Sequence, residues 1–104
     1  MTDSELLDDF NRTGNKASFD QIVQLHQYEI RGYLSRFVRN EHDADDLTQD
    51  VFLKVFESRG YEVDQPAIAW LTTIAQRVAV EYLRKQRKLE SEKRRANRIL
   101  AIGL

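Results

Sequence analysis

The sequence has no cysteine, one proline and four glycines among its 104 residues. Without cysteine the chain can form neither a disulfide nor a thiolate metal site, and nothing in it favours an oxidising compartment. The scarcity of helix breakers favours helix throughout. No segment shows the alternating polar and apolar pattern of a strand flanked by turns. The sequence therefore predicts an all-α fold.

Long apolar runs and catalytic motifs are missing as well. No run approaches the ~20 apolar residues that span a bilayer, and the N-terminal stretch MTDSELLDD is acidic where a signal peptide is basic. We therefore expect a soluble, cytoplasmic protein without a membrane partner. The two histidines stand apart, and the carboxylates at 43, 45, 46 and 50 lack the spacing of a calcium loop. No nucleophile has a partnering base. These absences predict a non-enzymatic protein with no catalytic residue, metal or cofactor.

Apolar residues at helical spacing predict four helices in one domain. The first covers about 4–13, with Ser4 or Asp3 as N-cap and Gly14 as the stop, and the second runs from about 16 to 38. The third has Asp43 as N-cap and reaches about Arg59, where Gly60 ends it. The fourth starts at Pro66 and reaches about 98, and residues 99–104 read as a frayed end or another element. The predicted fold is a compact bundle of three main helices plus a short N-terminal helix, with the last helix long and basic.

Charge is divided unevenly along the chain. Residues 1–50 hold eleven acidic and five basic residues, a net of −6, whereas residues 77–98 hold nine basic and three acidic residues, a net of +6. Cations at a helix C-terminus complement the macrodipole, but that effect covers the last turn and not about six turns. We therefore expect the basic helix to bind nucleic-acid phosphate. Its clustered cations are Arg84, Lys85, Arg87, Lys88, Lys93, Arg94, Arg95 and Arg98.

The third predicted helix has two faces. A rotation of ~100° per residue gathers one set of residues into a core face. A second strip lies away from that face, with Leu53 roughly opposite the core. One interpretation is a solvated acidic face with one exposed leucine. The other is a docking strip in which Leu53 is an apolar anchor and Asp45, Asp46, Gln49 and Asp50 pair with a basic partner. The core face comprises Ala44, Leu47, Thr48, Val51, Phe52 and Val55, and the second strip Asp45, Asp46, Gln49, Leu53 and Phe56, with Asp50 at its edge.

Two aromatic residues stand near the start of the basic helix. Tyr61 lies in the polar segment GYEVDQ. It either stacks on unpaired bases beside the basic helix or tucks into the bundle, and the sequence leaves both placements open. Trp70 is predicted to lie in the core, with its indole N–H needing a partner.

The run DADDLTQDVFLKVF at 43–56, followed by Tyr61 and AWLTTIAQRVAVEYLRKQRK at 69–88, resembles region 2 of bacterial sigma factors of the extracytoplasmic-function (ECF) group. The resemblance extends upstream through GNKASF at 14–19 and covers about residues 4–90. Accordingly, residues 1–90 are predicted to form a sigma region 2 helical domain. Residues 91–104 are an extension of the basic helix or the start of an interdomain linker.

The resemblance implies two partners, and an anti-sigma factor is a third to consider. The third helix is implied to dock on the β′ clamp helices of core RNA polymerase. The segment 60–68 and the fourth helix are implied to recognise and melt the promoter minus-ten element by holding its single-stranded non-template strand, with one base flipped into a pocket. The implied polymerase-binding residues are Asp45, Asp46, Gln49, Asp50 and Leu53, and the implied DNA-binding residues are Tyr61, Gln65, Ala67, Thr73, Arg77, Arg84, Lys85, Arg87 and Lys88.

Two positions depart from the family pattern. Arg77 stands where the WLxxIAxN pattern has asparagine, and Ala67 stands where an aromatic residue is often found. The base contact of that asparagine therefore does not transfer to this chain. The helix-turn-helix domain that reads the minus-thirty-five element is not in this sequence, and we expect a longer protein rather than a natural truncation. Two other readings stay open: a sigma-mimic module that sequesters an anti-sigma factor without binding DNA, and a generic RNA-binding helical protein.

Overall fold

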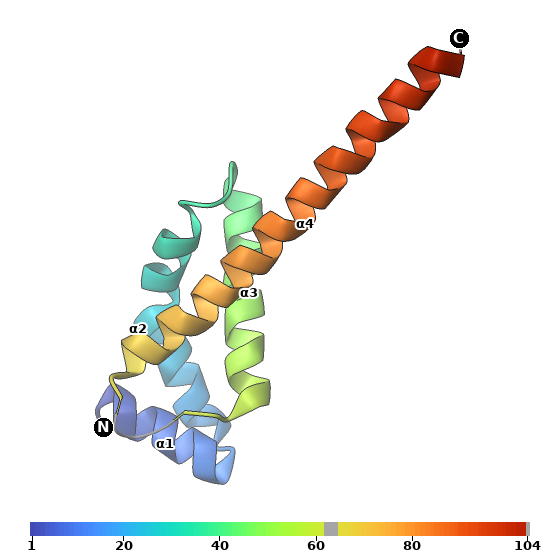
Figure 1. The fold of residues 1–104 in the computed structure, drawn as a ribbon. Coiled ribbons are helices and arrows are strands. Elements are labelled where there is room, and N and C mark those ends of the chain that lie inside the picture. The colour runs from blue at the N-terminus through green and yellow to red at the C-terminus, as the bar shows by residue number, and fades with distance from the viewer. Residues whose placement is uncertain (62–64, 104) are drawn as a thin grey trace.

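The computed structural model describes residues 1–61 and 65–103, and these form four α-helices. The helices are α1 (Asp3–Thr13), α2 (Lys16–Leu34), α3 (Glu41–Ser58) and α4 (Ala67–Gly103). The first three pack together with the first half of α4 into a bundle, and the second half of α4 projects from it (Figure 1). No strand occurs in the described ranges, and the predicted all-α fold is confirmed.

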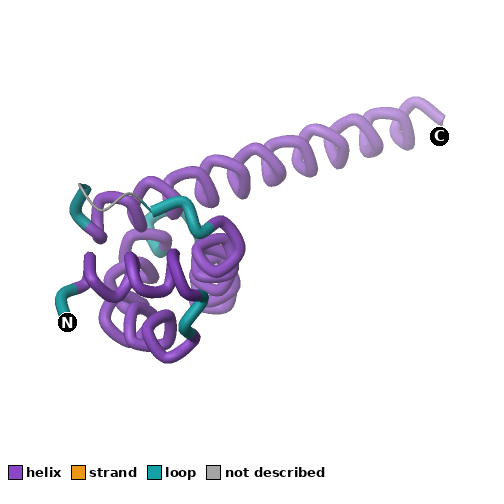
Figure 2. Tube along the Cα trace, turned by 90° about the horizontal axis from the view of Figure 1, so that it is seen from below, coloured by secondary structure: helices purple, strands orange, loops and turns teal. Residues whose placement is uncertain are grey.

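The length of α4 gives the molecule its shape. Its 37 residues span about 55 Å at 1.5 Å per residue. The whole molecule measures 65 × 22 × 21 Å, and the end of α4 extends well past the other helices (Figure 2). Residues 99–103, expected to fray or to begin another element, continue the helix. Residues 84–103 are all exposed, and this half of α4 is here called the rod. Its first turns still line surface grooves beside the bundle, through Lys85, Gln86, Arg87 and Glu90.

The core lies where the four helices meet, and α3 contributes to it as predicted. All members of its predicted core face are buried. The polar member of that face, Thr48, donates its hydroxyl proton to the Ala44 carbonyl over 2.7 Å, so no unpaired hydroxyl is buried there. The first half of α4 adds Ala67, Leu71, Ile74, Ala75, Val78 and Ala79. The rest of the core comes from α1 and α2, through Leu6, Leu7, Phe10, Ile22, Ile30 and Leu34.

The helix starts obey capping chemistry, but two of them use a different residue from the predicted one. At α1 the N-cap is Thr2, because its side chain accepts the Glu5 N–H. At α3 the N-cap is Asn40 rather than Asp43, because its side chain accepts the Asp43 N–H at 2.8 Å. The C-cap of α1 is Gly14, in the left-handed conformation with φ 70°, as predicted.

Two helix ends differ from the prediction. The α2 helix ends at Leu34, and Ser35 closes it by donating its N–H and hydroxyl to the Arg31 carbonyl. The apolar residues that follow pack half-buried against the core from the next turn. At the end of α3, Arg59 rather than Gly60 takes the left-handed conformation, with φ 45°. Its guanidinium lies 5.3 Å from the centre of the Phe10 ring on α1, a cation–π contact that favours this turn.

Candidate protein and nucleic-acid interfaces

The surface of α3 that faces away from the core presents an apolar side chain among polar ones. Leu53 is 55% exposed, and Asp46, Gln49 and Asp50 on the two preceding turns are exposed too. Residues three and four apart lie side by side on a helix, so these four form one continuous surface. We call it the acidic–apolar strip. Within the described residues, neither Gln49 nor Asp50 makes a side-chain hydrogen bond, so both can receive a partner.

Leu53 stands between two grooves. One runs between α2 and α3 and is lined by Phe19, Val23 and Phe56 along with Leu53 itself. The other runs between α3 and α4. An exposed apolar side chain with a groove on either side suits contact with the helices of a partner protein. The second groove is lined by Leu47, Asp50, Leu53, Lys54, Glu57, Val78, Glu81, Tyr82 and Lys85.

Asp46, at the N-terminal end of the strip, and its neighbour Asp45 have partners inside the protein. Asp45 forms an ion pair with Arg31 of α2, and this hydrogen bond raises the pKa of Arg31. Asp46 lies 3.4 Å from the His42 ring nitrogen Nε2, one turn earlier on the same helix. All five predicted polymerase-binding residues thus lie on α3, but the charge of Asp45 is already paired with Arg31.

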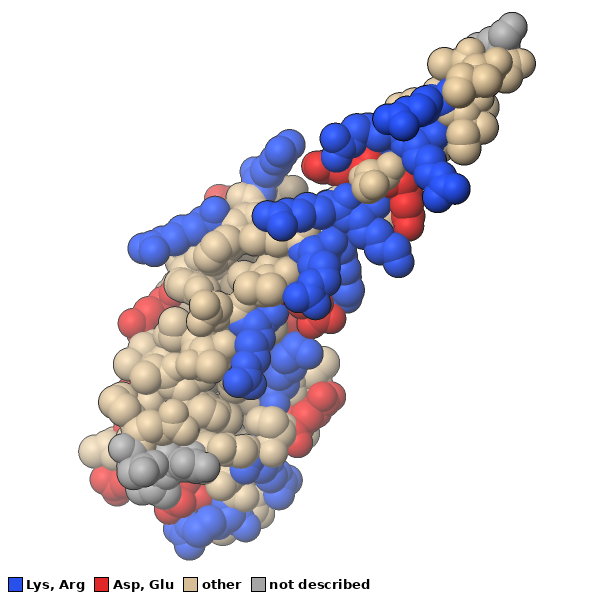
Figure 3. Space-filling view, in the orientation of Figure 1, with Lys and Arg blue, Asp and Glu red and all other residues tan. Residues whose placement is uncertain are grey.

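Cations dominate the outer half of α4. Lys and Arg side chains follow this helix from the bundle out along the rod (Figure 3). Arg84, Arg87 and Lys88 are exposed and make no ion pair with any described residue, whereas Lys85 lies 3.4 Å from Glu81. Three of these four cations are therefore available to a polyanion such as nucleic acid, since no described carboxylate pairs with them.

Four of the predicted DNA-binding residues form a line along α4. At ~100° of rotation per residue, Thr73, Arg77, Arg84 and Lys88 fall within an arc of about 60°. All four are exposed. We call this line the cationic stripe. The Thr73 hydroxyl donates to the Ala69 carbonyl of its own helix at 2.9 Å, so the charge of the stripe comes from the three cations.

The stripe passes another groove, between the end of α3 and the start of α4. It is here called the α3–α4 groove and is distinct from the groove beside Leu53. Trp70 and Ile74 give this groove an apolar wall, and Lys54 and Arg77 line it as cations. The remaining lining residues are Glu57, Ser58 and Gly60. An aromatic surface beside cations is the combination that holds unpaired bases and their phosphates.

Two residues of the predicted DNA-binding set, Tyr61 and Ala67, are buried. Each is 4% exposed, and the Tyr61 ring packs edge-on against Trp70 with centroids 5.4 Å apart. Neither side chain can touch a base in this conformation. Of the two placements that the sequence left open for Tyr61, the packed one is found, because its hydroxyl is bonded to the Gln65 carbonyl and to Ser4. Gln65 is half-buried at the edge of this cluster.

Trp70 differs in part from its prediction. It packs against the core as expected, but it is half-buried and also lines the α3–α4 groove. A signal for this was present, because Trp70, Thr73 and Arg77 have the i, i+3, i+7 spacing of one helix face. Lys54 was also missed, since only the fold brings it to this groove. Among the described residues, no group of three or more His, Asp or Glu is placed to hold a metal ion. Nor is any described helix both long and apolar enough to cross a membrane.

Comparison with known proteins identifies relatives over most of the chain. Residues 11–89 match the Sigma-70 region 2 family. The chain is 41% identical over 81 residues to the RNA polymerase sigma factor CarQ of Myxococcus xanthus, which covers 77% of this chain and 47% of that protein. It is 32% identical over 88 residues to the ECF RNA polymerase sigma factor SigE of Mycolicibacterium smegmatis, covering 80% and 34%. The chain thus spans less than half the length of these two relatives.

A solved structure shares the fold. It is the NMR structure of the complex formed by an engineered region 2 of sigmaE with GTAAAA, and it superposes with a TM-score of 0.75 at 26% sequence identity. The match covers 83% of this chain and 90% of that one. The family match over residues 11–89 includes α2, α3 and the first half of α4, and therefore covers the two-faced helix and the start of the cation-bearing helix. The chain therefore belongs to the Sigma-70 region 2 family, and its relatives place it with region 2 of ECF sigma factors.

Proposed function

We propose that this domain docks on core RNA polymerase and recognises and opens the minus-ten element of a promoter, as region 2 of a cytoplasmic ECF sigma factor. It acts by binding and catalyses no reaction. One observation carries the proposal: a single small bundle exposes the acidic–apolar strip on α3 and the cationic stripe on α4. Surfaces of opposite charge on different helices allow a protein and a nucleic acid to be held at once.

The docking partner proposed for α3 is the pair of clamp helices of the β′ subunit. Leu53, with more than half of its surface in water, supplies the apolar anchor. Gln49 and Asp50 have free hydrogen-bonding groups on the turn before it, within the described residues. A central apolar anchor ringed by polar contacts is the usual anatomy of an energetic hot spot. An anti-sigma factor that blocks this domain is expected to cover the same strip.

The proposed DNA site is the α3–α4 groove together with the cationic stripe. Trp70 and Ile74 offer an apolar wall to an unstacked base, while Lys54 and Arg77 can reach its phosphates. The stripe continues through Arg84 and Lys88 onto the rod, where further phosphates of the same strand can bind. The related region 2 of sigmaE was solved in complex with GTAAAA, which supports nucleic-acid binding by this domain.

The test is to titrate the domain with core polymerase and then with DNA. We expect the domain to bind core polymerase on its own. The resulting complex is expected to retain members of a single-stranded DNA pool randomised at six positions, and the recovered strand is expected to bind more weakly as salt rises. Failure to bind core polymerase will refute the docking proposal. Core binding without retention of any strand will favour the sigma-mimic alternative.

A further inference from the structure

We infer that α1 sets the geometry of the α3–α4 groove through Tyr61, so that Ser4, Asn11 and Tyr61 are positioning residues for promoter recognition. The inference rests on the proposed function and names residues that do not themselves touch DNA. Ser4 lies outside the segment 11–89 that matches the family, so the match does not account for this contact.

The hydroxyl of Tyr61 joins α1 to the start of α4. It lies 2.5 Å from the Gln65 carbonyl oxygen and 2.9 Å from Ser4 Oγ. A carbonyl oxygen can only accept, so Tyr61 donates its one proton to Gln65 and accepts the proton of Ser4. The chain just before α4 is therefore tied to the first turn of α1.

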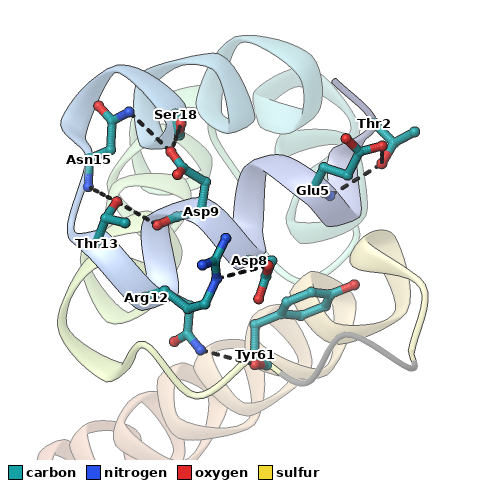
Figure 4. Close-up of polar contacts among 10 residues, drawn as sticks. Thr2, Glu5, Asp8, Asp9, Arg12, Thr13, Asn15, Ser18 and Tyr61 are labelled. Atoms are coloured by element: carbon teal, nitrogen blue, oxygen red, sulfur yellow. Dashed lines mark hydrogen bonds and ion pairs between the residues drawn. The ribbon is translucent and has the colours of Figure 1, made fainter.

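The main chain of Tyr61 is held by the same helix. The Asn11 side chain donates from Nδ2 to the Tyr61 carbonyl oxygen at 3.2 Å. Ser4 and Asn11 are seven residues apart, so they lie on the same face of α1, about 10 Å from each other. Tyr61 thus lies along α1 (Figure 4) and is hydrogen-bonded to this helix at both its carbonyl and its hydroxyl.

Arg59, the residue that follows α3, contacts the C-terminal end of α1. Arg59 has a positive φ, which is uncommon for a residue with a side chain. Its guanidinium lies over the Phe10 ring and reaches the backbone at Gly14: a Cβ built on that glycine would come within 2.7 Å of Arg59 Nη2. The direction in which the chain leaves α3 is therefore fixed against α1, two residues before Tyr61.

The contact that reaches the groove is the one between two aromatic rings. Tyr61 packs edge-on against Trp70, at a centroid distance of 5.4 Å and an interplanar angle of 69°. Trp70 in turn lines the α3–α4 groove beside Ile74 and Arg77. Because protein interiors are close-packed, a shift of the Tyr61 ring is passed on to Trp70. Removing the hydrogen bonds between Tyr61 and α1 is expected to let Trp70 take up several positions, so that the groove wall fits the base less well.

Tyr61→Phe isolates this effect, because it removes the hydroxyl and keeps the ring against Trp70. We expect the affinity for the strand recovered from the randomised pool to fall about fivefold or more, while affinity for an oligothymidine of equal length falls less than twofold. Binding to core polymerase and helix content by circular dichroism are expected to stay unchanged. Ser4→Ala is expected to reproduce a smaller loss, and its combination with Tyr61→Phe to add little.

The matched control is Tyr28→Phe. Tyr28 is 78% exposed on α2, and its hydroxyl bonds to no other described residue, so its removal is expected to change nothing. Loss of thermal stability in Tyr61→Phe with an unchanged preference for the recovered strand will overturn the inference and leave the proposed function intact. If the wild-type domain prefers no strand at all, the proposed function fails and the inference fails with it.

Discussion

Arg31 of α2 donates a hydrogen bond from Nε to Asp45 Oδ1 at the start of α3, over 2.5 Å. The hydrogen bond to Asp45, together with its negative charge, raises the pKa of Arg31. Asp50, one turn closer to Leu53, forms no ion pair with any described residue. Of these two carboxylates, Asp50 is therefore the one whose charge is free to attract a basic partner, although the sequence shows equivalent carboxylates at both positions.

This difference predicts unequal effects of removing the two carboxylates. Asp50→Ala is expected to weaken binding to core polymerase about fivefold, or ~1 kcal/mol, since it removes a charge that is free to pair with the partner. Asp45→Ala is expected to weaken it less than twofold, since that charge is already satisfied by Arg31. Fluorescence titration of the labelled domain with core enzyme measures both. Equal losses, or a larger loss in Asp45→Ala, will contradict the assignment.

Truncation of the apolar anchor is expected to have a larger effect on docking. Leu53→Ala should weaken binding to core polymerase about tenfold, or ~1.4 kcal/mol, and leave the melting temperature within a few degrees because the side chain lies outside the core. Leu25→Ala is the matched control. Leu25 is 56% exposed, against 55% for Leu53, but lies on α2 away from the strip. Similar affinities of the two variants for the polymerase would refute the docking surface.

Neutralising the cationic stripe should change the salt dependence as well as the affinity. Each of Arg77→Ala, Arg84→Ala and Lys88→Ala is expected to lower the slope of log K against log salt by about 0.7, the contribution of one phosphate contact on a single strand. Lys16→Ala serves as control, because Lys16 is exposed at the start of α2, far from the stripe in sequence. A slope that stays constant through all three variants excludes the stripe as the phosphate contact.

The Asp9 carboxylate predicts a pH dependence of stability. The hydrogen bond from the Ser18 hydroxyl has the largest effect on the pKa of Asp9 and lowers it. Burial opposes this, and the Asn15 amide and the Arg12 charge lower the pKa further, so that the pKa lies below its usual value (Figure 4). A lowered pKa stabilises the fold above about pH 4, and this contribution is lost as the pH falls through the folded-state pKa. Asp9→Asn is therefore expected to melt at a lower temperature than wild type at pH 7, and this difference is expected to shrink as the pH falls below about 4. Circular dichroism melts across this range measure the difference, and a gap that persists at the acid end would contradict the prediction.

Two glycines predict opposite responses to alanine. Gly14 has φ 70°, and a Cβ there would also press on the Arg59 guanidinium, so Gly14→Ala is expected to cost about 1–2 kcal/mol. Gly32 lies within α2, where an added Cβ meets nothing within 4 Å. Gly32→Ala is thus expected to stabilise the domain by about 0.5–1 kcal/mol. Urea unfolding of both variants gives the two free energies, and the same sign for both would show that backbone conformation does not decide them.

Features set by local periodicity were predictable from the sequence. The core face of α3 follows from residues three and four apart, and it is buried as expected. The exposure of Leu53 follows from the same rotation count. Gly14 as the α1 cap rests on a preference of a single residue type. These features need no knowledge of the rest of the chain.

Features set by distant partners were not predictable. Tyr61 is buried because Asn11 and Ser4, fifty and fifty-seven residues earlier, bind its carbonyl and hydroxyl. Its polar surroundings in the sequence gave no sign of either contact. Arg59 ends α3 in the left-handed conformation beside Phe10, where a local rule favours the next residue, Gly60. In both cases a contact with α1 overrides the local preference.

The rod also governs how the protein approaches its targets. It carries half of the sixteen Lys and Arg residues to one end of a 65 Å body, while residues 1–50, with a net charge of −6, make up most of the opposite end. Such a body is a strong electric dipole, and the field of a polyanion exerts a torque on it before contact. Under the proposed function, the domain is therefore expected to turn during diffusion so that the rod leads, and its collisions with DNA are expected to begin in a productive orientation more often than for an unpolarised body.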